Sequence, residues 1–164
     1  MKKWLVRLGG ILMVAVLIAA GYVLGYDRGA RTRTTAEQQA LEREFERSMT
    51  GVILEGSFTV DGREDSELTV ERYTVERVER MAGDIWVFHA RIQYGERDVT
   101  LPVPVRIRWA GDTPVITLTD ANIPGLATFS ARVLFYRDHY AGMWSNPRVG
   151  GHQFGIVVRE PARE

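Results

Sequence analysis

The feature that most constrains the fold is a two-residue alternation of apolar and polar side chains, which begins after Gly51 and recurs to about residue 160. It is clearest in Val99–Trp109, where every second residue is Val, Leu, Ile or Trp. Alternation of this period is typical of half-buried β-strands. Turn sequences such as Asp61-Gly62 separate the runs. The pattern predicts strands at residues 52–60, 72–80, 86–94, 99–109, 115–119, 126–137, 140–144 and 151–159.

The connections between these runs are short, so neighbouring strands are expected to pair antiparallel. No helix is predicted after residue 50 to cover a flat sheet, and the sheet must therefore close on itself or fold over into a sandwich. We expect an all-β domain at residues 51–160, an eight-stranded antiparallel meander forming a small barrel, with a tail at 161–164. Pro102 and Pro104 remove ladder donors from the fourth run, which leaves a split barrel or a sandwich as alternatives. The alternation breaks near Arg77, where we expect a β-bulge.

Residues 8–26 contain no charged side chain. At helical rise they span about 28 Å, close to the hydrocarbon thickness of a bilayer. We predict an N-terminal transmembrane helix in residues 1–27, with a cleaved signal peptide as the alternative. Basic residues flank the segment on both sides, but a short basic N-terminus normally stays in the cytoplasm. The expected location is therefore the bacterial inner membrane, single-pass, with the C-terminal domain periplasmic or extracytoplasmic.

Glycines recur every four residues through the end of this segment, at Gly21, Gly25 and Gly29. Such a face lets two membrane helices approach closely and predicts a homodimer through Gly21 and Gly25. The alternative is that glycine is simply common in membrane spans.

Residues 28–50 are expected to form a linker and a short juxtamembrane helix. Thr34 with Glu37, or Thr35 with Gln38, has the spacing of a capping box. A narrow apolar stripe follows, at Leu41, Phe45 and Met49. The stripe is suited either to packing on the chain's own domain or to pairing with a neighbour in the membrane plane.

Charge and composition exclude several kinds of function. The chain has 164 residues, no cysteine and three histidines, and its basic and acidic residues are equal in number. After residue 26 arginines are interspersed with acids, which argues against nucleic-acid binding. The absence of cysteine excludes disulfides and thiolate chemistry. His89, His139 and His152 do not have metal-ligand spacing, so we expect no metal, no cofactor and no catalytic set. The rival is an enzyme that uses His139 or His152 with a carboxylate at a barrel mouth.

Aromatic side chains are the one positive signal for function, because they fall mostly on the apolar phase of the strands. They predict either a filled core or a cavity for a small apolar ligand. In the second case Arg132, Tyr136 or His152 is expected to supply a polar contact. His152 alternates in phase with Phe154, Ile156 and Val158, so this phase of the last strand is expected to point towards the apolar side or the rim. The candidate ligand-binding residues are Trp86, Phe88, Trp109, Arg132, Tyr136, Trp144 and His152.

Residues 140–144 and 150–155 read Tyr-Ala-Gly-Met-Trp and Gly-Gly-His-Gln-Phe-Gly. They resemble the C-terminal part of a group of bacterial membrane-anchored envelope proteins, and the likeness implies no activity. Gly142-x-Trp144 is also similar to the G-x-W motif of lipocalins, which makes the expected barrel lipocalin-like. In lipocalins that motif belongs to the first barrel strand, whereas here it falls in the seventh, so no lipocalin binding residue is carried over.

Together these observations predict a membrane-anchored, non-enzymatic envelope protein. Its β domain is expected to bind a small apolar ligand or an envelope partner. The alternative, suggested by the glycine face and the Leu41/Phe45/Met49 stripe, is a structural subunit of an envelope assembly.

Overall fold

The computed structural model describes residues 34–62 and 68–159. The chain divides into two compact units, Met1–Gln39 and Ala40–Glu164. The elements are α2 (Thr35–Met49), β1 (Val52–Phe58), β2 (Thr69–Ala82), β3 (Ile85–Tyr94), β4 (Arg97–Ala110), β5 (Thr113–Ile123), β6 (Ala127–Tyr136), β7 (His139–Ser145) and β8 (Gly150–Arg159).

The predicted membrane anchor, its orientation and the predicted glycine dimer face all lie outside the described residues. Within residues 34–62 and 68–159, no helix has both the length and the apolar character needed to cross a bilayer.

A capping box begins helix α2, as the spacing of Thr34 and Glu37 predicts. The Glu37 backbone N–H donates to Thr34 Oγ1 at 3.3 Å, and the Thr34 backbone N–H donates to Glu37 Oε2 at 2.9 Å. These two bonds satisfy donors that the first helical turn leaves without intrahelical partners.

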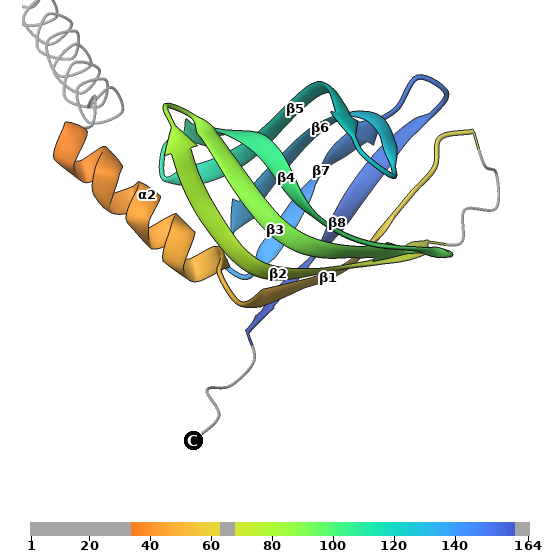
Figure 1. Cartoon of the computed structure of the whole chain (residues 1–164), viewed down its shortest axis with the longest axis horizontal. Coiled ribbons are helices and arrows are strands. Elements are labelled where there is room, and N and C mark those ends of the chain that lie inside the picture. The colour runs from red at the N-terminus through yellow and green to blue at the C-terminus, as the bar shows by residue number, and fades with distance from the viewer. Residues whose placement is uncertain (1–33, 63–67, 160–164) are drawn as a thin grey trace, which may run out of the picture. The chain divides into compact units, whose positions relative to one another are not determined.

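The eight strands form one closed antiparallel barrel in which each strand pairs with the next and β1 pairs with β8 (Figure 1). The prediction of an all-β, eight-stranded antiparallel meander is therefore confirmed. The expected bulge near Arg77 is also present, because the β2–β3 register shifts between Val75 and Arg77.

The barrel is closed unevenly, since β4 and β5 pair only from Arg106 to Ala110. The earlier part of β4, which contains Pro102 and Pro104, pairs with β3 alone. The β4–β5 pairing ends at Thr117, and the β5–β6 register shifts between Leu118 and Ala121, where Asp120 has a φ of 47°. The prolines thus lie where a strand needs hydrogen bonds on one side only. The predicted fifth strand was too short, because β5 continues beyond this bulge to Ile123.

One strand phase was predicted wrongly, that of β8. His152, Phe154 and Ile156 face outward, and Phe154 and Ile156 are each 45% exposed. Gly151, Gln153, Gly155 and Val157 occupy the inward phase instead. The outer face of β6–β8 consequently carries several exposed apolar side chains: Leu134, Tyr136, Met143, Phe154 and Ile156.

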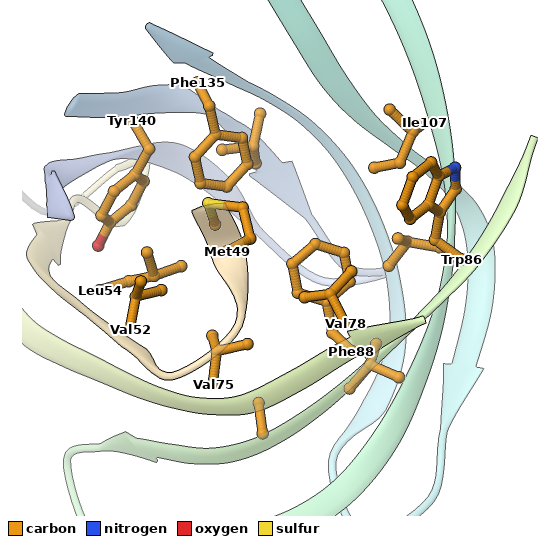
Figure 2. Packing of buried hydrophobic residues seen from close by; sticks show 14 of the residues in the cluster. Met49, Val52, Leu54, Val75, Val78, Trp86, Phe88, Ile107, Phe135 and Tyr140 are labelled. Carbon is orange, nitrogen blue, oxygen red and sulfur yellow. The ribbon is translucent and has the colours of Figure 1, made fainter. Parts of the chain in front are cut away.

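Helix α2 contributes Phe45 and Met49 to the barrel's core, where they are 5% and 3% exposed. The Phe45 ring meets Trp86 edge to face, with centroids 5.6 Å apart, and Trp109 at 5.9 Å. Both tryptophans lie beside turns at one end of the barrel, and Phe45 and Met49 of α2 fill the interior at that end. Figure 2 shows Met49 with Phe135, Val78 and Phe88 among the inward-pointing side chains. The stripe therefore packs on the chain's own domain, the first of the two expected arrangements.

Candidate functional site

The other part of the barrel interior holds a cavity of about 280 Å³. It extends from Phe88 and Phe135 in the middle of the barrel to Leu126 and Asn146 in turns at the end opposite α2. All eight strands contribute to its wall, and most lining side chains are apolar. Such a cavity has the character of a site for a small apolar molecule.

A carboxyl group with two tyrosine hydroxyls is the main polar feature of the wall. Glu71 on β2 is 2% exposed. Tyr73 Oη donates to Glu71 Oε2 at 2.7 Å, and Tyr140 Oη donates to Glu71 Oε1 at 2.9 Å. Of the described residues that line the cavity, Glu71 is the one Asp, Glu, Lys, Arg or His. We call these three residues the Glu71 cluster.

Two glycines allow Tyr140 on β7 to reach Glu71 across two intervening strands. In the register of the sheet, Tyr140 lies opposite Gly155, Gly155 opposite Gly56, and Gly56 opposite Glu71. A Cβ on Gly155 would lie 2.6 Å from Tyr140 Cε1, and one on Gly56 would lie 2.2 Å from Tyr140 Oη. The ring therefore occupies the space that side chains at these two positions would fill, so one glycine on β8 and one on β1 permit close packing where the barrel closes.

Burial raises the pKa of Glu71 above its usual range, and the hydrogen bonds from Tyr73 and Tyr140 offset part of this effect. Burial and the neighbouring Glu71 charge raise the pKa of both tyrosines. The two hydroxyls therefore stay protonated at neutral pH and remain donors to the carboxyl group.

The raised pKa of Glu71 predicts a pH-dependent stability. The folded state holds this proton more tightly than the unfolded state, so the contribution of Glu71 to the free energy of unfolding falls as the pH rises above the unfolded pKa of about 4.3 and levels off above the folded pKa. Glutamine does not titrate. We expect Glu71→Gln to gain stability relative to the wild type between pH 4 and pH 8, as measured by urea denaturation of the full chain.

The matched control is Glu96→Gln, which removes the same charge from an exposed turn residue. The difference in free energy of unfolding between Glu96→Gln and the wild type is expected to change little between pH 4 and pH 8. A Glu71→Gln difference that is equally insensitive to pH would show that the folded state does not perturb this carboxyl group.

The structure brings only two of the seven predicted site residues into the cavity wall, Phe88 and Trp144. Trp86 and Trp109 pack around Phe45 at the end of the barrel that the α2 side chains fill. Within the described chain, Trp144 Nε1 is buried without a hydrogen-bond partner.

The expectation that Arg132, Tyr136 or His152 supplies the cavity's polar contact is wrong, because all three are exposed and none lines it. Arg132 instead bonds the backbone carbonyl of Leu118 and the Thr119 hydroxyl. Tyr136 lines a separate hollow beside α2 and the strand turns.

The histidines are not placed as the rival enzyme hypothesis requires. His89 lies 3.1 Å from Glu79 Oε2, but neither residue lines the cavity. His139 and His152 are exposed and line neither of the two hollows. The described residues therefore do not form the expected histidine–carboxylate pair at a barrel mouth.

Glu71 and Tyr73 were absent from the predicted site, and a signal for them was present. Glu71 has the same strand phase as Tyr73 and Val75, and that phase faces inward. The predicted strand began at Arg72, and the neighbouring Glu-Arg pairs are typical of a solvated surface. An acidic residue in phase with two apolar ones indicates burial, and extension of the predicted strand by one residue would have included Glu71.

Comparison with models of protein families, with curated proteins and with solved structures found no match. The resemblance to bacterial envelope proteins therefore stays a prediction.

Proposed function

We propose that this protein is a non-enzymatic binding module that takes a small apolar molecule into its barrel. The cavity of about 280 Å³ with its largely apolar wall is the observation that supports this most strongly. In the same proposal residues 1–27 anchor the domain on the periplasmic side of the bacterial inner membrane. Burial of apolar surface provides the binding free energy, at about 25 cal/mol per Å² removed from water.

The cavity's volume limits the size of the ligand. A water molecule occupies about 30 Å³ of liquid, so the space corresponds to roughly ten non-hydrogen atoms. A medium-length alkyl chain matches this size. A longer chain would have to extend past the turns that contain Leu126 and Asn146.

Photolabelling tests the proposal on the full chain in lipid nanodiscs. The probe is decan-1-ol with a diazirine on its alkyl chain, and labelled peptides are identified by mass spectrometry. We expect adducts on cavity residues such as Ile92, Val103 and Phe129. We also expect unlabelled decan-1-ol to prevent them. Adducts confined to residues outside the cavity would contradict the proposal.

A variant that fills the cavity is expected to lose binding while the barrel still folds. Ala131 on β6 lines the cavity, so Ala131→Phe extends a ring into it. Ala141 on the neighbouring strand is exposed on the outer face, and Ala141→Phe is the matched control. We expect about tenfold less photolabelling of cavity peptides in Ala131→Phe and wild-type labelling in Ala141→Phe. Equal labelling of the two folded variants would place the binding site elsewhere.

A further inference from the structure

The position of the Glu71 cluster carries an inference about which apolar molecules the cavity accepts. We propose that the cluster selects ligands whose polar group is an uncharged hydrogen-bond donor, an aliphatic alcohol, and excludes those that end in a carboxylate. This inference rests on the proposed function, because it specifies the head group of a ligand held in the same cavity.

The hydrogen-bonding capacity of Glu71 is the first step of the argument. A carboxylate has about four acceptor sites. The hydroxyls of Tyr73 and Tyr140 each occupy one, on different oxygens. Glu71 therefore retains acceptor capacity for a donor supplied by a ligand. An alcohol hydroxyl on a chain in the apolar part of the cavity meets this requirement.

The charge of the cavity wall is the second step. Burial raises the pKa of Glu71, while donation by both tyrosine hydroxyls opposes this shift and favours the ionised form. A fatty-acid carboxylate in the cavity would lie close to the Glu71 carboxyl group, and the two groups cannot both be ionised there without strong repulsion, because water is scarce. No Lys, Arg or His is among the described residues that line the cavity, so none is there to neutralise the pair.

The shape of the site is the third step, because the Tyr140 ring fits closely over two glycines. Tyr140 is 3% exposed and lies across Gly155 and Gly56. The ring therefore holds the Tyr140 oxygen 2.9 Å from Glu71 Oε1, and its proton is donated to that carboxyl group. Both tyrosine protons are used in hydrogen bonds to Glu71, so the remaining polarity of the cluster is that of an acceptor.

Competition against the photoreactive decanol tests this selectivity. Decan-1-ol and decanoate have the same chain and differ in head group. Each is titrated at pH 7.5 against cavity labelling of the full chain in nanodiscs, with the amount of competitor expressed as its mole fraction in the lipid. For the wild type we expect decan-1-ol to compete at an about tenfold lower mole fraction than decanoate.

Glu71→Gln removes the charge and nearly preserves the shape, so it is expected to reduce this preference to about threefold or less. Glu96→Gln, which removes an exposed charge, is the control and is expected to keep the wild-type preference. Equal competition by the two compounds in the wild type would overturn the inference. So would a preference that Glu71→Gln leaves unchanged.

The proposed function and the inference fail in different ways. If decanoate competes as well as decan-1-ol for cavity labelling, the cavity binds apolar molecules and only the head-group selectivity is wrong. If neither compound competes and the cavity peptides are not labelled, both are wrong. The wild-type comparison needs no variant, so it decides the selectivity even if Glu71→Gln fails to fold.

Discussion

Replacement of Gly155 by alanine is expected to destabilise the barrel by about 3 kcal/mol or more. The added Cβ would lie 2.2 Å from the Glu55 carbonyl oxygen and 2.7 Å from Gly56 Cα. Both atoms belong to the backbone of β1, so no side-chain rotation relieves the clash and the two strands that close the barrel must separate. A loss of this size is a large share of the 5–15 kcal/mol that stabilises a typical domain.

Urea denaturation of the full chain, followed by near-ultraviolet circular dichroism, measures this effect. Gly83→Ala is the matched control. Gly83 has a φ of +58° and no atom within 4 Å of the position of a Cβ, so its replacement adds backbone strain of about 1 kcal/mol without a clash. If Gly155→Ala destabilises the protein no more than Gly83→Ala does, β1 and β8 are farther apart than the structure places them.

Truncation of Phe45 to alanine is expected to cost about 3–5 kcal/mol, the range for large aromatic side chains in well-packed cores. Phe45 belongs to α2, yet its ring centroid lies 6.3 Å or less from those of Trp86, Phe88, Trp109 and Phe135. Its removal leaves a void among these rings. We also expect stronger quenching of tryptophan fluorescence by acrylamide, because Trp86 and Trp109 lose the side chain that covers them.

Arg43→Ala is the control for this prediction, since Arg43 is an exposed residue of the same helix. Its effect on the free energy of unfolding is expected to stay within about 0.5 kcal/mol. If Phe45→Ala has an equally small effect, the helix does not contribute to the core of the barrel.

Much of the fold could be predicted from the sequence, because strand period and turn chemistry are local properties. The alternation in residues 99–109 predicts β4, and its break near Arg77 predicts a bulge that the β2–β3 register confirms. The end of β5 was missed because Asp120 interrupts the alternation. Its positive φ and its hydrogen bonds with Ser130 form a bulge that the strand continues past.

The site was less predictable, since the main errors concern which way side chains face. In β8 the apolar residues Phe154 and Ile156 suggested the inward phase, but Gly151 and Gly155 occupy it. Glycine has no side chain to contribute to a hydropathy pattern, so the pattern favoured the outer face. The same error placed His152 beside a cavity that it does not line.

The order of residues along the chain determined that this protein forms eight antiparallel strands in a meander, because alternation and short turns restrict each segment independently of the others. Only the tertiary structure decided that the interior is partly hollow and that a carboxyl group lies within it. The bond between Tyr140 and Glu71 joins residues 69 positions apart. It depends on the registers of β7, β8, β1 and β2 together, and on two glycines whose missing side chains make room for one ring. Pairings of that range are set by how the whole sheet closes, which no local pattern specifies.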